Sequence, residues 1–150
     1  MAASTKLARA AAGPVGAAVL LAVAGCGARV AYAPVGGKVT LGGKPLAGVK
    51  VWFHPLTEGK EGLPYATGLT DSAGVYQLTS NNGQDGALVG KHRVVIDWPP
   101  RERTDDRSRP PPPQGPPIPL PYTQASATPL ILEVKAGGPQ TIDLPLRTQP

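Results

Sequence analysis

Apolar and polar residues alternate in seven short segments of the chain, and this period of two is typical of β-strands that bury one face. The first segment is centred on Val39 and Leu41, and the second runs from Val49 to Phe53. The others lie at residues 65–70, 75–78, 88–98, 130–135 and 142–146. Strands this short cannot bury their apolar faces alone, so the pattern predicts an all-β fold in which these strands share one core.

Glycine, proline and short polar side chains mark the turns between these segments. The glycines and the proline of residues 42–48 separate the first two strands, which predicts that these strands meet at the corner of a β-meander. Asp71 can accept hydrogen bonds from the amides just after it, and Gly74 can adopt a positive φ, so a tight turn is expected there. The pair Asn82-Gly83 indicates another tight turn.

The phase of the alternation predicts which side chains face the core. Tyr76 and Leu78 are expected to point inward from the fourth strand. Four residues of the fifth strand share one face: His92, Val94, Ile96 and Trp98. Trp52 falls on the outward phase of the second strand and is a candidate contact surface, although single exposed aromatic residues are common. Pro145 cannot donate to a ladder, so the last strand is expected at a sheet edge.

Residues 99–121 interrupt the alternation between the fifth and sixth strands. They are rich in proline and contain a charged run at 101–109. This composition cannot bury enough apolar surface to offset its chain entropy, so we expect a disordered, partly polyproline II insertion. The alternative is that the proline run docks on the aromatic groove of a partner. Tyr122, directly after the insertion, is expected to pack at the edge of the fold.

Composition and charge restrict the classes of function. The chain has 150 residues, with 19 glycines, 19 prolines and 5% aromatic residues, which suits one small domain with many turns. The formal net charge of +5 falls to 5 − 2 = +3 if Lys6 and Arg9 are removed with a leader segment. Charges of both signs are interspersed and no aromatic residues lie among them, so nucleic-acid binding is not expected.

The N-terminal segment has the organisation of a secretion signal. Lys6 and Arg9 precede an alanine-rich apolar run at residues 10–24, which is short for a membrane span of about 20 apolar residues. The run ends in V-A-G-C, whose cysteine is Cys26, and this sequence resembles the lipobox of bacterial lipoproteins. The resemblance implies that residues 1–25 are a cleaved signal peptide and that Cys26 is acylated. Several acyl chains give stable anchoring in membrane lipid. An ordinary secretory signal and an uncleaved segment are the alternatives.

The lipoprotein resemblance also implies a location. Gly27 follows Cys26 where some bacteria place an aspartate that retains lipoproteins at the inner membrane. We therefore expect the cell envelope, at the periplasmic face of the outer membrane or at the cell surface. Residues 26–34 would be a lipidated tether, and the spacer after Cys26 reaches only about 25 Å when fully extended. Cys26 is the only cysteine, so no intramolecular disulfide is expected.

Three stretches together resemble the carboxypeptidase regulatory-like domain. They are G-K-V-T-L-G-G-K-P-L-A-G-V-K-V-W-F at 37–53, T-D-S-A-G-V-Y-Q-L at 70–78 and G-K-H-R-V-V-I at 90–96. The resemblance implies a seven-stranded, prealbumin-like (transthyretin-like) β-sandwich of Ig-like Greek-key type, here over residues 35–147. Such domains serve as accessory, adhesive or linker modules, so the resemblance implies little about function.

Few residues could carry out chemistry. His54 and His92 are the only histidines, and neither has a metal-ligand spacing to cysteine, aspartate or glutamate. His92 is expected in the core. The chain has no G-x-S-x-G or H-E-x-x-H motif, and we expect no cofactor. Transthyretin-like hydrolases use a C-terminal Tyr-Arg-Gly-Ser, whereas this sequence ends in L-R-T-Q-P.

A calcium site is the alternative for a group of oxygen-bearing side chains. If the turns met at one end of the fold, four residues could surround a cation: Asp71, Asn81, Asn82 and Asp85. Their spacing is not that of an EF-hand, and all four residues are ordinary turn formers. We therefore expect no metal site.

These observations predict a lipid-anchored, non-enzymatic protein of the cell envelope that acts as a structural or binding module. Its partners would be membrane lipid, through acylated Cys26, and an envelope protein or glycan. The first alternative is a carbohydrate- or peptide-binding protein that uses the Trp52 face or the proline-rich loop. The second is a transthyretin-like hydrolase.

Overall fold

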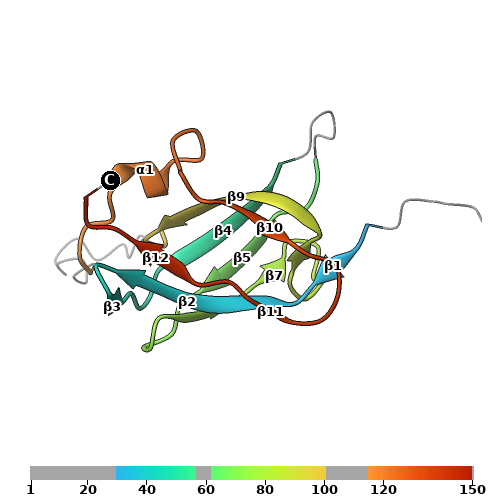
Figure 1. Ribbon diagram of the computed structural model, residues 1–150, viewed down its shortest axis with the longest axis horizontal. Coiled ribbons are helices and arrows are strands. Elements are labelled where there is room, and N and C mark those ends of the chain that lie inside the picture. Colours follow the sequence, from blue (N-terminus) through green and yellow to red (C-terminus); the bar gives the residue numbers. More distant parts are fainter. Residues whose placement is uncertain (1–29, 57–61, 101–114, 150) are drawn as a thin grey trace, which may run out of the picture.

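The computed structural model describes residues 30–56, 62–100 and 115–149. These residues form twelve β-strands and one short helix (Figure 1). The strands are β1 (Tyr32–Ala33), β2 (Val35–Leu41), β3 (Lys44–Pro45), β4 (Lys50–Pro55), β5 (Ala66–Leu69), β6 (Val75–Gln77), β7 (Thr79–Ser80), β8 (Ala87–Leu88), β9 (Gly90–Asp97), β10 (Ile131–Val134), β11 (Gln140–Thr141) and β12 (Leu144–Leu146). The helix is α1 (Leu120–Thr123). The expected all-β class is confirmed, because strands predominate in the described residues.

Two larger β-sheets and one two-stranded sheet organise these strands. The β4 sheet has the strand order β10-β9-β4-β5-β7, and each neighbouring pair is antiparallel. The β2 sheet is built on β2, which pairs in parallel with β11 and β12 and antiparallel with β3 and β6. The small sheet pairs β1 with β8. β4 and β2 each have partners on both sides, so they are the central strands of the two large sheets.

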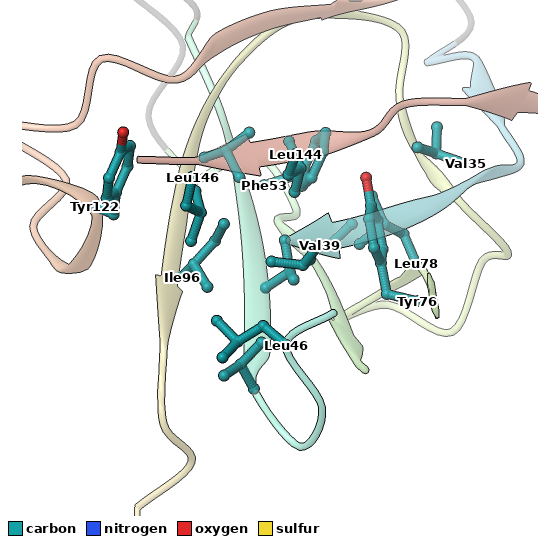
Figure 2. Close-up of a cluster of buried hydrophobic side chains, with 14 of the residues drawn as sticks. Val35, Val39, Leu46, Phe53, Tyr76, Leu78, Ile96, Tyr122, Leu144 and Leu146 are labelled. Atoms are coloured by element: carbon teal, nitrogen blue, oxygen red, sulfur yellow. The ribbon is translucent and has the colours of Figure 1, made fainter. Parts of the chain in front are cut away.

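The core lies between the inner faces of the two large sheets (Figure 2). Val39 of β2 and Leu144 of β12 enter it from one side, while Phe53 of β4 and Ile96 of β9 enter it from the other. None of these four side chains is more than 1% exposed. Burying such side chains is the main favourable contribution to folding, at about 1.5–3 kcal/mol for each.

A close backbone approach holds the C-terminal chain against β2. The Tyr76 hydroxyl donates a 2.6 Å hydrogen bond to the carbonyl of Ile142, and Figure 2 shows that hydroxyl pointing toward the C-terminal chain. The Ile142 amide donates a 2.7 Å hydrogen bond to the carbonyl of Gly36. A Cβ atom at Gly37 would collide with the Ile142 carbonyl, so the absence of a side chain there is what allows the approach.

All seven alternating segments contain strands of the structure, which confirms the strand predictions. The fifth segment is divided by Val89 into β8 and β9. Sequence periodicity did not predict β1, β3, β7 and β11. Each of these has two residues, which is too short to display an alternation.

The expected meander corner between the first two segments is wrong. β2 turns at residues 42–43 and pairs with β3, whereas β4 pairs with β5 and β9 in the other sheet. The chain crosses between the sheets around Leu46, which is 3% exposed and belongs to the core. The alternation reports which face of each strand is apolar. It does not report whether two such faces lie in one sheet or oppose each other.

The turn at Asp71 forms as expected. The Asp71 Oδ1 atom accepts hydrogen bonds from the amides of Ala73 and Val75, both at 2.9 Å, and Gly74 has a φ of 75°. These bonds satisfy amides that the ladder leaves free, so they fix the path from β5 into β6.

Parts of the expected tether and of the expected insertion are ordered, although their composition did not indicate it. Tyr32 and Ala33, within the tether 26–34, form β1, and the Val89 amide donates a 2.8 Å hydrogen bond to the Ala31 carbonyl. Residues 101–114 of the insertion lie outside the described residues. The part from 115 to 121 is described, and there Ile118 joins the core and α1 begins. The helix was not predicted, and its Tyr122 is 5% exposed.

The sheet edges formed by β12 and β10 carry local obstacles to further pairing. Pro145 lies in β12, which pairs only with β2, as expected for a proline at an edge. Beyond the end of β10, the Lys135 amide donates to Oε1 of Gln140 at 3.0 Å, and Nε2 of Gln140 donates to the Lys135 carbonyl at 2.6 Å. Within the described residues, no helix has the length and hydropathy that crossing a membrane requires.

Candidate functional site: a groove on the outer face of the β4 sheet

Trp52 lies on the outer face of the β4 sheet. Val51 and Phe53, its neighbours along β4, are both 0% exposed, whereas Trp52 is half-buried. In register, Trp52 is opposite Thr67 of β5 on one side and Val95 of β9 on the other. The structure therefore places Trp52 outward, as the phase of the alternation predicted, at the middle of the sheet rather than at its edge.

A shallow groove of about 450 Å³ opens beside Trp52. Its floor comes from β4 and β9, and its walls come from the chain before β5 and from the chain at the end of α1. α1 lies against β9 (Figure 1). The lining residues are Trp52, His54, Tyr65, Val95, Asp97, Thr123 and Ala125.

The aromatic part of the groove is formed by Trp52, His54 and Tyr65. The rings of His54 and Tyr65 have centroids 5.8 Å apart and are inclined by 38°, a separation typical of an aromatic pair. The Lys50 Nζ atom lies 5.4 Å from the centroid of the Trp52 ring, within the range of a cation–π contact. Planar rings on a sheet face give a ligand apolar surfaces to stack on.

Partial burial, and then the positive charge of Arg93, lower the pKa of His54 below its ordinary value of 6.5. Arg93 is the residue directly opposite His54 on β9. The shift favours the neutral form of His54, in which one ring nitrogen donates a hydrogen bond and the other accepts one.

The polar part of the groove is formed by Asp97 and Thr123. One Asp97 carboxylate oxygen, Oδ1, accepts a 2.7 Å hydrogen bond from the Trp98 amide, which orients the carboxylate. The Thr123 hydroxyl donates a 2.9 Å hydrogen bond to the Leu120 carbonyl inside α1. Because its single hydrogen is used there, this hydroxyl can only accept a hydrogen bond from a ligand.

His92 lies on the opposite face of the sheet, in the core, as expected. It is 0% exposed, its Nε2 atom is 2.6 Å from the Leu88 carbonyl, and its ring packs 5.7 Å from that of Phe53. Nδ1 has no hydrogen-bond partner among the described residues. Burial lowers the pKa of His92, while the backbone carbonyls of Leu88 and Phe53 oppose this shift. A ligand outside the protein does not reach this imidazole.

The alternative calcium site is wrong. Asp71 begins the turn after β5, whereas Asn81 follows β7 and donates its amide to the Tyr65 carbonyl before β5. Asp71 and the polar turn that starts at Asn81 therefore lie at opposite ends of β5. The Asn82 side chain donates a 2.7 Å hydrogen bond to the Tyr32 hydroxyl. In the described ranges, no group of three or more His, Cys, Asp or Glu side chains could hold a metal ion.

A second hollow, of about 490 Å³, lies where β2, β6 and β11 begin or end. Its lining includes Pro34, Gly36, Gly86 and Pro139 but no aromatic side chain. Its lining also contains polar side chains such as Gln77, Asp85 and Gln140, but it lacks a ring on which a ligand could stack, so we take the Trp52 groove as the stronger candidate.

The sequence predicted one residue of the groove as a contact surface, Trp52. It missed Tyr65, Val95, Asp97, Thr123 and Ala125, which are contributed by separate stretches of the chain. The alternation along residues 88–98 places Asp97 on the outward side, and this was the only sequence signal for it. No sequence signal indicated Thr123 or Ala125, which follow the insertion. Cys26 and the signal segment lie outside the described residues. No family model, curated protein or solved structure matches the chain.

Proposed function

We propose that this protein is a lipid-anchored, non-enzymatic module of the cell envelope that binds a partner in the Trp52 groove. The observation that carries the binding role is the groove itself, because aromatic rings and hydrogen-bonding groups from separate stretches of the chain meet there on an exposed sheet face. Concave sites that combine apolar rings with a few polar groups are typical of ligand recognition.

We further propose that the fold is a prealbumin-like β-sandwich of the carboxypeptidase regulatory-like type. The stretches that resemble this family fall on ordered elements: residues 37–53 span β2 to β4, residues 70–78 contain the Asp71 turn and β6, and residues 90–96 lie in β9. The two packed sheets agree with such a sandwich.

The lipid anchor rests on the lipobox-like sequence that ends at Cys26. The fold supports it in one respect, because β1 begins at Tyr32, only a few residues after the cysteine. Figure 1 shows β1 at one end of the molecule, with the C-terminal end beside α1 at the other. An anchored domain would thus turn its β1 end toward the membrane, at the periplasmic face of the outer membrane or at the cell surface.

Palmitate labelling tests the anchor. Cells that express the full chain should incorporate radiolabelled palmitate into it and retain it in the membrane fraction, and the Cys26→Ser variant should lose both properties. Incorporation that survives Cys26→Ser would refute the anchor.

Cosedimentation with purified cell-wall sacculi, which are free of membrane lipid, tests the binding role. We expect Trp52→Ala to release the full-length protein, with Ile131→Ala as the matched control. Ile131 is 54% exposed and lies on the same sheet outside the groove. If both variants sediment like the unaltered protein, the Trp52 groove is not the binding surface.

The hydrolase alternative has less support. His92 is enclosed in the core, and His54 has Arg93 opposite it but no cysteine or serine among the residues that line the groove. The one aliphatic hydroxyl of the groove, that of Thr123, donates its hydrogen to the Leu120 carbonyl rather than to His54, so it forms no hydroxyl–imidazole pair of the kind that activates a nucleophile.

A further inference from the structure

We infer that the ligand of the Trp52 groove is a neutral oligosaccharide chain. This inference rests on the proposed binding function and names the ligand class for the same site. Aromatic rings and hydrogen-bonding side chains both line the groove, and together they match the two surfaces of a sugar, whose C–H faces are apolar and whose rim carries hydroxyl groups.

The floor of the groove offers side chains only. β4 pairs with β5 through Trp52–Thr67 and with β9 through Trp52–Val95, so its backbone groups are already used in the two ladders. A peptide cannot add to this surface as a further strand, because strand addition requires free backbone donors and acceptors. A ligand here is recognised by stacking and by side-chain hydrogen bonds.

Two sheet edges, β10 and β12, also resist strand addition. At β10, the Ile131 amide donates to the Pro129 carbonyl at 3.1 Å, and the Gln140 side chain occupies both backbone groups of Lys135. At β12, Pro145 has no amide hydrogen to donate. Extended peptides that bind β-proteins depend largely on such edges, so these obstacles disfavour a peptide that adds at β10 or β12.

Charges of both signs around the groove favour a neutral ligand. Lys50 lies over the Trp52 ring and Arg93 lies opposite His54, while Asp97 is part of the lining. A strongly anionic or cationic ligand would meet a like charge within the same site, which opposes binding. A sugar hydroxyl can instead donate to the Asp97 carboxylate or to the Thr123 hydroxyl, and can exchange hydrogen bonds with neutral His54.

The shape of the groove agrees with a chain rather than a single small molecule. It is open to solvent along the sheet face, and its lining extends from His54 and Tyr65 at one end to Asp97 and Thr123 at the other. An enclosed pocket would bury a small ligand on all sides. An open groove instead leaves both ends of a polymer free to continue.

Isothermal titration of the full-length protein with cellotetraose and with chitotetraose tests this inference. We expect saturable binding of at least one tetrasaccharide. Trp52→Ala should weaken it about ten-fold, because one stacked ring contributes about as much free energy as a ten-fold change in Kd requires. Trp52→Phe keeps an aromatic face, so it should weaken binding less. Asp97→Asn should also weaken binding, whereas Ile131→Ala should leave the dissociation constant unchanged.

Each outcome decides between the ligand classes. Tetrasaccharide binding that depends on Trp52, in variants whose thermal melting remains cooperative, supports the inference. Binding of decaproline but of neither sugar overturns it and assigns a polyproline ligand. Trp52-dependent cosedimentation with sacculi, without binding of either sugar, also overturns it but leaves the proposed binding function intact. If Trp52 affects neither measurement, both proposals fail.

Discussion

The two faces of the β4 sheet carry different kinds of residue on the same strands. His92 of β9 and His54 of β4 show the contrast: the first is 0% exposed beside Phe53, and the second lines an open groove beside Tyr65. The inner-face side chains are packed in the core between the sheets, so the loss of one costs stability. On the outer face a side chain can change without disturbing the core, so that face is free to serve recognition.

The largest expected effect is a difference in stability between a substitution on the inner face and one on the outer face of the β4 sheet. Phe53→Ala should lower the free energy of unfolding by about 3–5 kcal/mol, because it leaves a cavity in the core. Trp52→Ala, one residue away on the outer face, should cost clearly less, since the side chain is only half-buried. Urea titration of both variants measures the difference. Equal losses would show that the outer face is as important for stability as the inner one.

The pH dependence of stability sharpens the contrast between the histidines. Burial lowers the pKa of His92 in the folded state, so below its ordinary value of 6.5 the unfolded chain binds a proton that the folded chain excludes. The stability present above pH 6.5 should therefore fall on acidification, by up to about 1.4 kcal/mol per pH unit for one proton, until the folded-state pKa is reached.

Denaturant midpoints between pH 8 and pH 5 test this dependence. His92→Leu should remove most of the decrease. His54→Gln should remove less of it, because His54 is partly exposed. A pH profile that is unchanged in His92→Leu would contradict the assignment to the buried histidine.

A smaller loss of folding stability is expected when the buried hydroxyl group of Tyr76 is removed. Tyr76→Phe removes the 2.6 Å hydrogen bond to the Ile142 carbonyl, and it should cost about 1 kcal/mol. The ring stays in the core, so the effect should be well below that of Phe53→Ala. Thermal melting checks this order. A Tyr76→Phe variant as unstable as Phe53→Ala would mean that the hydroxyl, rather than the packing, holds the C-terminal chain.

The smallest effect is expected on the outer face at Lys50. Lys50→Ala removes the cation–π contact with Trp52, which at an exposed site contributes about 0.5–1 kcal/mol. We expect a shift in urea midpoint near the limit of measurement. A loss above about 2 kcal/mol would show that this contact belongs to the stabilising part of the molecule.

Local chemistry determined much of the fold. The alternation located every strand longer than two residues, the carboxylate of Asp71 identified a turn, and Pro145 indicated an edge strand. The phase of the alternation also placed His92 inward and Trp52 outward. These inferences succeed because adjacent side chains on an extended backbone must point to opposite sides, whatever the rest of the chain does.

Pairing and assembly were decided only in three dimensions. The sequence alone did not show that β2 and β4 belong to different sheets, nor that Thr123 and Ala125, beyond the insertion, join Trp52 at one groove. Partner choice depends on contacts between residues far apart in the chain, and their free energies exist only once the core has formed. Periodicity thus determined which way each residue faces, while tertiary packing determined which residues it meets.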